Sequence, residues 1–188
     1  MTYIDIPGHG WWYAVTVIDY YSRYLLACHL TAGCSAPEVA AVIGLAMKEA
    51  ERLHGPLEKM PFLVTDNGSC FLARRFQSAI KEKFRHVRIR YRTPQQLGLL
   101  ERFHQTLKRE EVYWQLYDNP QDAREKLDAF RTRYNDVRPH WALEPAGGGD
   151  VLTPKDVYVD VAQITLPRWQ CWAMAAKRKQ RRLDAQSG

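Results

Sequence analysis

The sequence has few cysteines and no long apolar run, and these absences exclude several classes of protein. Four cysteines occur among 188 residues, and no two of them form a CxxC pair. A zinc cluster or a disulfide framework is therefore not indicated. The longest apolar runs are far too short to cross a membrane, and no charged-then-apolar signal segment opens the chain. We therefore expect a cytoplasmic protein without a membrane partner.

The composition fits one compact domain. Hydrophobic residues make up 46% of the chain, which is enough for a substantial core, so disorder is not expected. Lysine and arginine together number 27 against 21 aspartate and glutamate residues, which gives a net charge of +6. This balance favours a polyanionic partner without identifying one.

Strand signals dominate the beginning of the chain. Two β-rich runs flank residues 7–10, Pro-Gly-His-Gly, which predicts a hairpin, and residues 24–30 would add a third strand. Ser35 followed three residues later by Glu38 is typical of a helix start, and apolar residues then recur at helical spacing as far as Leu53. The pattern predicts an antiparallel start followed by a long helix.

The second half of the pattern is mainly helical. Residues 61–65 form a short apolar run that ends at Asp66, as in a buried strand that delivers a side chain at its tip. The further predicted elements are a helix over 71–84, a strand over 87–91, a loop over 93–98, a helix that carries Glu101 and an amphipathic helix over 122–135. Strands first and helices later predict a mixed α/β fold.

Asp66 is the first candidate for chemistry. It leaves an apolar strand and enters a tight turn that Asn67 and Gly68 can accommodate. A carboxylate at such a place can face both a metal ion and solvent. For an isolated Asp-Asn-Gly, capping of the following helix is the alternative interpretation.

Glu101 is the second candidate. Gln105 and Lys108 follow it at four and seven residues, so they share its helical face, whereas the apolar residues between them occupy another face. A single glutamate in the first turn is also explained by the helix dipole alone. The pairing of this helix with the Asp66 segment is more specific than either feature by itself.

Several ordered segments resemble the integrase core of insertion-sequence transposases and retroviral integrases. They are TYIDIPGHGWWYAVTVIDYYSRYLLA with its I-D-x-Y-S-R signature, VTDNGSCF, TPQQLGLLERFHQTLKRE, and YNDVRPHWAL followed by LTPKDVY. The spacing from Asp66 to Glu101 is close to the one for which that family is named. The resemblance implies a ribonuclease-H-like α/β fold, a mixed sheet flanked by helices, with the catalytic core over residues 1–158 and a basic C-terminal extension over 159–188.

The same resemblance implies the site residues and their cofactor. Asp66 and Glu101 become catalytic residues and metal ligands, and the cofactor becomes Mg²⁺ or Mn²⁺, two ions in the family. Hard carboxylate oxygens suit Mg²⁺, and paired ions can activate the attacking oxygen and stabilise the leaving one. The candidate DNA contacts are Arg102, Gln105, Lys108 and Arg138.

The catalytic set departs from the family at its first member. That carboxylate belongs to a D-x-T motif on the first strand, and here the aspartate would precede Met1, either because the start lies too late or because the chain was truncated. Asp5 would face the opposite side of the sheet. Asp19 would come nearer, although hydrogen bonding to the Ser22-Arg23 turn is the favoured role for it.

The expected function is that of a transposase or integrase core. It would act on double-stranded DNA, both transposon ends and target, by metal-dependent phosphodiester cleavage and strand transfer, as a homo-oligomer in the bacterial cytosol or nucleoid. The alternative is a catalytically dead DNA-binding or assembly subunit of a transposition complex. A nuclease of the ribonuclease-H type is a third interpretation, against which RPHWAL and LTPKDVY argue.

Three further groups of residues allow two interpretations each. For His104, a solvated position is favoured over contact with DNA. For Arg138 and the following Pro-His, phosphate binding and hydrogen bonding to the carbonyls at a helix end are equally favoured. For five aromatic residues, a core or interface position is favoured over stacking on bases. These are Trp11, Trp12, Tyr13, Tyr20 and Tyr21.

Overall fold

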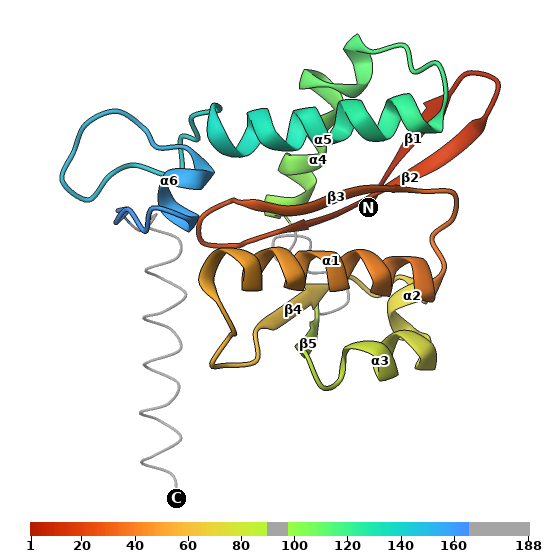
Figure 1. Cartoon of the computed structure of the whole chain (residues 1–188), viewed down its shortest axis with the longest axis horizontal. Helices are drawn as coiled ribbons and strands as arrows, with labels where there is room; N and C mark the ends of the chain where they lie inside the picture. The colour runs from red at the N-terminus through yellow and green to blue at the C-terminus, as the bar shows by residue number, and fades with distance from the viewer. Residues whose placement is uncertain (90–97, 166–188) are drawn as a thin grey trace, which may run out of the picture.

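The computed structural model describes residues 1–89 and 98–165 and begins with a three-stranded antiparallel sheet (Figure 1). Its strands are β1 (Thr2–Ile6), β2 (Gly10–Ile18) and β3 (Leu25–Thr31), in the order β1-β2-β3. Gly8 and Gly10 have φ angles of 76° and 73°, a left-handed conformation that glycine adopts without strain. The predicted hairpin is therefore confirmed.

Helices cover both faces of this sheet. Figure 1 shows α1 (Ala36–His54) and α5 (Pro120–Asp136) on opposite sides of β3. The predicted start of α1 is confirmed, because the Glu38 carboxylate accepts hydrogen bonds from the Ser35 amide at 3.0 Å and the Ser35 hydroxyl at 2.5 Å. On the α5 side, α4 (Gly98–Glu110) contributes Phe103 and Leu107 to the same core.

Two core clusters of buried side chains hold the helices against this sheet. Alternate residues of β1 point to the α4 and α5 side, and the exposed residues between them point away. The first cluster includes Ile4, Ile6, Leu25, Leu30, Phe103, Leu107, Leu127 and Phe130. The second cluster lies on the α1 side and includes Val15, Ala27, Val39, Val42, Ile43, Phe71 and Phe76.

A second, parallel sheet carries the segment around Asp66. It consists of β4 (Phe62–Thr65) and β5 (Arg85–Arg88), with Val64 opposite Val87. Antiparallel and parallel pairing are thus both present, as expected for a mixed architecture, although the described strands form two sheets. The predicted strand over 87–91 begins earlier than expected, and its last two residues lie outside the described residues.

The single helix predicted over 71–84 is wrong. The structure has α2 (Ser69–Leu72) and α3 (Arg74–Ile80), separated by Ala73 in an extended conformation with φ −61° and ψ 134°. Phe71 and Phe76 are both buried and pack edge to face, with ring centroids 5.3 Å apart. In one continuous helix, residues five apart point in different directions, so the break lets both rings enter the core.

The C-terminal part closes the α5 side. After α4 come a short 3-10 helix, η2 (Val112–Trp114), then α5 and α6 (Pro154–Tyr158). Asn135 joins α5 to β3, because its Oδ1 accepts from the Leu25 amide at 2.8 Å and its Nδ2 donates to the Leu25 carbonyl at 3.1 Å. Ile164 remains buried beside Leu143, so the chain still packs on the core just beyond α6.

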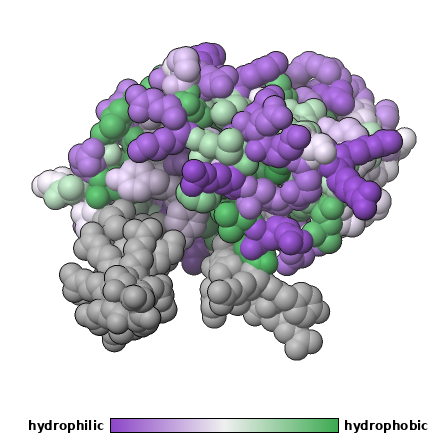
Figure 2. Space-filling view, turned by 90° about the horizontal axis from the view of Figure 1, so that it is seen from below, coloured by the Kyte–Doolittle hydropathy of each residue, from purple (hydrophilic) through white to green (hydrophobic). Residues whose placement is uncertain are grey.

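The described surface is mixed in polarity. On the face shown in Figure 2, hydrophilic residues cover most of the described surface and hydrophobic residues lie between them in small groups. Within residues 1–89 and 98–165, no helix is long and apolar enough to cross a membrane. Most of the predicted loop over 93–98 and of the basic extension over 159–188 lies outside the described residues.

Candidate nucleic-acid active site

Asp66 follows β4 directly and is exposed. Its Oδ1 accepts a hydrogen bond from the Gly68 amide at 2.8 Å, and Asn67 donates to the Ile89 carbonyl at 3.0 Å, beyond the end of β5. The N-cap of α2 is Gly68, so the capping interpretation of Asp66 is wrong: the carboxylate closes a local turn instead. A Cβ at Gly68 would lie 2.9 Å from Asp66 Oδ1, so a larger residue there would displace the carboxylate.

Glu101 lies in the first turn of α4 and is exposed. Among the described residues, no ion pair involves Glu101. Gln105 is exposed one turn later on the same helix, and Lys108 is half-buried near its C-terminal end. The first half of α4 therefore presents a carboxylate and an amide to solvent, while Phe103 and Leu107 hold the helix to the core.

Met1 connects the two carboxylate segments. Burial lowers the pKa of its amino group, and the Asp66 carboxylate opposes that shift. Burial also lowers the pKa of His104 to about 3, with smaller contributions from the Met1 amino group and Lys108. The Met1 amino group therefore feels the charge of Asp66 at the end of β4, and its own charge acts on His104 of α4.

His104 is not solvated, so that prediction is wrong. Its Nε2 and the Thr16 Oγ1 lie 3.1 Å apart in a partly buried hydrogen bond between α4 and β2. Thr16 is two residues after Ala14 in β2, so its side chain lies on the same face of the strand, the face that meets α4. Only the packing of α4 on the sheet brings these two residues together, so helical spacing alone gave no signal of it.

The two other candidate carboxylates, Asp19 and Asp5, lie in different environments. Asp19 Oδ2 accepts hydrogen bonds from the Tyr21 amide at 3.1 Å, the Ser22 amide at 2.8 Å and the Ser22 hydroxyl at 2.7 Å. The turn-stabilising role predicted for Asp19 is therefore confirmed. Asp5 is exposed on the face of β1 opposite the buried Thr2, also as predicted. Within the described residues, no three or more histidine, cysteine or acidic side chains form a metal-holding group.

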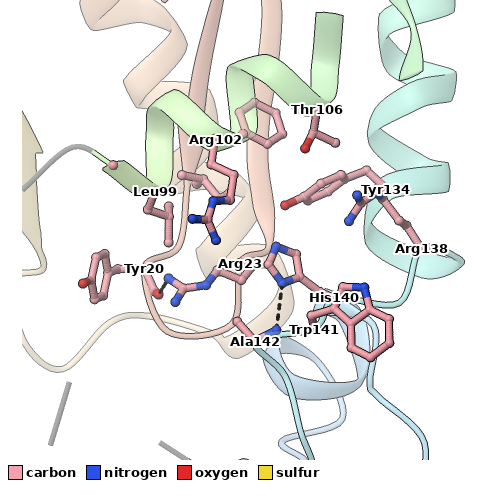
Figure 3. Close-up of a pocket in the computed structure, with 13 residues that line it drawn as sticks. Tyr20, Arg23, Leu99, Arg102, Thr106, Tyr134, Arg138, His140, Trp141 and Ala142 are labelled. Carbon is pink, nitrogen blue, oxygen red and sulfur yellow. Dashed lines mark hydrogen bonds between the residues drawn. The ribbon is translucent and has the colours of Figure 1, made fainter. Parts of the chain in front are cut away.

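The candidate DNA contacts occupy two separate places. Lys108 lines an open groove of about 730 Å³ on the hairpin side, together with Tyr3, Asp5, Trp11, Tyr13, Val112 and Tyr113. Arg102 and Arg138 instead line a pocket of about 510 Å³ that we call the arginine pocket (Figure 3). Its lining also includes Tyr20, Arg23, Gly98, Leu99, Thr106, Tyr134, His140 and Trp141.

The five aromatic residues, for which a core or interface position was predicted, differ in burial within this chain. Trp11, Tyr20 and Tyr21 are exposed, by 66%, 50% and 42%, and only Trp12 and Tyr13 are half-buried. Trp11 pairs with Asp5 near the hairpin turn, and Tyr20 and Tyr21 lie in the β2–β3 turn. Strand periodicity shows which face of a strand is apolar, but it does not show whether a neighbouring element covers these three side chains.

Comparison with known proteins gave matches among family models and among solved structures. Two models described as integrase core domain match the sequence, one over residues 1–94 and one over residues 73–146. Among curated proteins, no significant match was found.

Solved structures share the fold at low identity. One is a chain of the simian T-cell lymphotropic virus intasome in complex with PP2A regulatory subunit B56 gamma, with TM-score 0.66, 19% identity and coverage of 88% of this chain and 55% of that chain. Another is the HTLV-2 integrase catalytic core domain in complex with magnesium, with TM-score 0.58, 16% identity and coverages of 84% and 90%. The catalytic core domain of BIV integrase matches with TM-score 0.54, 22% identity and coverages of 80% and 85%. This chain thus spans about half of the intasome chain.

Proposed function

This chain belongs to the integrase core domain family, and from that membership we propose that it performs metal-dependent phosphodiester cleavage and strand transfer on DNA. The observation that carries the proposal is the pair of exposed carboxylates, Asp66 at the tip of β4 and Glu101 in the first turn of α4. The Met1 amino group is affected electrostatically by Asp66 and in turn affects His104, which lies on the same helix as Glu101. The proposed DNA is double-stranded, as the end of a mobile element and as the target, and the proposed assembly is a homo-oligomer.

The two carboxylates fit a hard divalent ion. Asp66 uses Oδ1 for the Gly68 amide, and no described residue donates a hydrogen bond to its Oδ2. Glu101 has no ion pair among the described residues. Mg²⁺ takes one or two carboxylates and fills its remaining positions with water and phosphate oxygens, so Asp66 and Glu101 would hold it. When bound, Mg²⁺ or Mn²⁺ would stabilise negative charge on the reacting phosphate oxygens.

The residues beside the carboxylates would hold the DNA. Gln105 shares the helical face of Glu101 and offers an amide donor, and Lys108 places a positive charge further along α4. The charge of Lys108 suits a phosphate of the DNA backbone, a contact that orients the strand without reading its sequence. His104 remains neutral in its hydrogen bond with Thr16, so it would serve as support for α4 rather than as a phosphate contact.

A second candidate function is a catalytically inactive DNA-binding or assembly subunit. One observation favours it: among the described residues no group of three or more acidic, histidine or cysteine side chains could hold a metal ion, and Asp19 uses its Oδ2 in its own turn. An aspartate placed directly before Met1 would add an acidic side chain at the N-terminal end of β1, where the Asp66 charge acts on the Met1 amino group.

The experiment measures Mg²⁺- or Mn²⁺-dependent nicking and strand transfer on labelled duplex DNA. Four proteins are compared with the chain itself: Asp66→Asn, Glu101→Gln, a version extended by Met-Asp before Met1, and Asp150→Asn as a control for an exposed aspartate in a remote loop. We expect cleavage that Asp66→Asn and Glu101→Gln abolish and that Asp150→Asn leaves unchanged. Activity only in the extended version would assign the subunit role to the present chain, and activity unaffected by Asp66→Asn would exclude the proposed site.

A further inference from the structure

The arginine pocket is built from three segments that are far apart in the sequence. The β2–β3 turn contributes Arg23, the first turns of α4 contribute Leu99 and Arg102, and the segment after α5 contributes His140 and Trp141. In Figure 3 the guanidinium of Arg102 points toward the Arg23 side chain, whose own guanidinium lies toward Tyr20, and the His140 ring is on the other side of Arg23. The pocket volume is about 510 Å³, a size typical of small-ligand sites.

Arg23 is the most unusual residue of this pocket. It is only 3% exposed, and its guanidinium donates a hydrogen bond to the Tyr20 carbonyl and lies 5.1 Å from the centroid of the Tyr20 ring. Burial lowers its pKa, the charges of Tyr20, Tyr134 and Asp19 oppose that shift, and no carboxylate forms an ion pair with it among the described residues. A buried cation without an ion-pair partner is unfavourable, so this position is suited to a negatively charged ligand.

The backbone conformation of Arg23 also favours a ligand site. Its φ angle is 65°, a left-handed conformation that is uncommon for a residue with a side chain. The turn is held in this shape by hydrogen bonds from the Arg23 amide to the Asp19 carbonyl at 3.0 Å and from Ser22 to the Asp19 carboxylate. Strained residues of this kind are concentrated at ligand-binding sites, and here the strain turns an arginine into the pocket.

The charges in the pocket are only partly balanced. Arg138 is neutralised by Glu110, with three hydrogen bonds of 2.7, 2.8 and 2.9 Å between their side chains. Arg102 has no ion pair among the described residues and interacts electrostatically with Arg23. Two positive charges, those of Arg23 and Arg102, therefore remain for a ligand, which matches the charge of a phosphate group.

His140 adds a neutral donor to the two arginines. Burial and the neighbouring Arg23, Arg138 and Arg102 lower its pKa to about 4. The Ala142 amide donates to its Nδ1 at 3.3 Å, the contact drawn as a dashed line in Figure 3. The neutral ring then carries its proton on Nε2, which is free to donate to a phosphate oxygen.

The pocket mouth has aromatic side chains. Trp141 is 90% exposed and Tyr20 is 50% exposed, and both line the same cavity as the arginines. Exposed aromatic rings beside positive charge are typical of sites that stack unpaired bases. A duplex is too wide for a cavity of this volume, whereas one nucleotide extruded from the helix can enter it.

We propose that the arginine pocket binds one unpaired nucleotide of a DNA strand, with its phosphate on Arg23, Arg102 and His140 and its base against Trp141. This proposal rests on the proposed function in one respect, namely that DNA is the polyanion that the chain binds. Since Arg102 directly follows Glu101, a nucleotide held here would keep its strand beside the candidate active site. Frayed or flanking nucleotides at a DNA end would then be separated from the strand that reacts.

The test compares the binding of two labelled DNAs by fluorescence anisotropy without divalent metal. One is a blunt duplex and the other is the same duplex with a short single-stranded overhang. We expect the overhang to raise affinity on the order of tenfold, which is the size of one base-stacking contact. Arg102→Ala and Trp141→Ala are both exposed positions whose substitution leaves the core intact, and each should remove this preference.

Arg109→Ala is the matched control, because Arg109 is an exposed arginine of the same helix that does not line the pocket. It should weaken both DNAs equally and keep the preference. Added deoxynucleoside monophosphate should compete for the overhang preference more strongly than inorganic phosphate does. Equal affinity of the parent chain for the two DNAs, or an unchanged preference in both pocket variants, would overturn the proposal. Since no metal is present, loss of cleavage activity and loss of this preference are separate results.

Discussion

Arg138 and Glu110 form a two-pronged ion pair that joins the segment after α5 to the last residue of α4. Three hydrogen bonds of 2.7, 2.8 and 2.9 Å connect the guanidinium to the carboxylate. Of the two interpretations of Arg138 made from the sequence, neither included this pairing. Phosphate binding by Arg138 stays a prediction, and its observed role is to hold one wall of the arginine pocket in place.

Glu110→Gln should weaken this connection. We expect a loss of about 1 kcal/mol in the free energy of unfolding, because both side chains are partly exposed and solvent screens the charges. Urea unfolding followed by circular dichroism measures it, with Glu58→Gln as a control for an exposed glutamate outside any ion pair among the described residues. Equal stability of Glu110→Gln and its parent would mean that the pair does not hold α4.

The stability of the fold should fall at mildly acidic pH. The folded-state pKa values of His104 and His140 lie below the usual 6.5, at about 3 and about 4, because burial disfavours the charged ring. The unfolded chain takes up protons first, so this stability is present above pH 6.5 and is lost as pH falls toward the folded values. The slope should approach roughly 1 kcal/mol per pH unit for each histidine.

Urea unfolding between pH 7.5 and 5 measures this slope in the parent and in His104→Gln. The glutamine can keep a hydrogen bond to Thr16 but does not titrate, so the variant should show a flatter pH dependence. Identical slopes in the two proteins would show that His104 ionises in the folded state as readily as in the unfolded chain.

Gly68→Ala should damage the proposed metal site more than the fold. The added Cβ would lie 2.9 Å from Asp66 Oδ1, so the carboxylate has to move, whereas the φ of −57° at Gly68 suits alanine. We expect Mn²⁺ binding, measured by isothermal titration calorimetry, to weaken about tenfold, as for other changes in the support of a metal ligand. Gly44→Ala is the control, since its Cβ meets nothing within 4 Å, and it should bind Mn²⁺ like the parent.

Lys108→Ala should lower DNA affinity in a salt-dependent way. Removing one phosphate contact reduces the slope of log affinity against log salt concentration by about one, because one fewer counterion is released. Anisotropy titrations from low to high salt measure the slope. Lys48→Ala on α1 is a suitable control for an exposed lysine away from α4. A Lys108→Ala slope equal to that of the parent would place Lys108 outside the DNA footprint.

Local patterns predicted the elements that depend on neighbouring residues. The hairpin follows from the glycines between two β-rich runs, and the start of α1 follows from Ser35 and Glu38. The strand before Asp66 follows from a short apolar run that ends in a turn. Each of these signals lies within a few residues of the feature it predicts, so the sequence alone was sufficient.

The break at Ala73, the burial of His104 and the exposure of Trp11 could not be predicted in this way. Each depends on which element packs opposite. Phe71 and Phe76 pack in the same core, and Thr16 forms a hydrogen bond with His104 of α4. Trp11 lies at the hairpin, where its side chain stays exposed. Sequence periodicity reports which face of an element is apolar, but it does not report what covers that face.

The sequence by itself determined the family and the α/β architecture, because these are encoded in ordered local motifs, and the same motifs predict the two carboxylates. Only the tertiary structure decided that Arg23, Arg102 and Arg138 surround one cavity and that Glu110 neutralises the last of them. The physical reason is that charge balance in a pocket is a property of distances between segments. Residues this far apart along the chain acquire such distances only when the sheet and its helices pack.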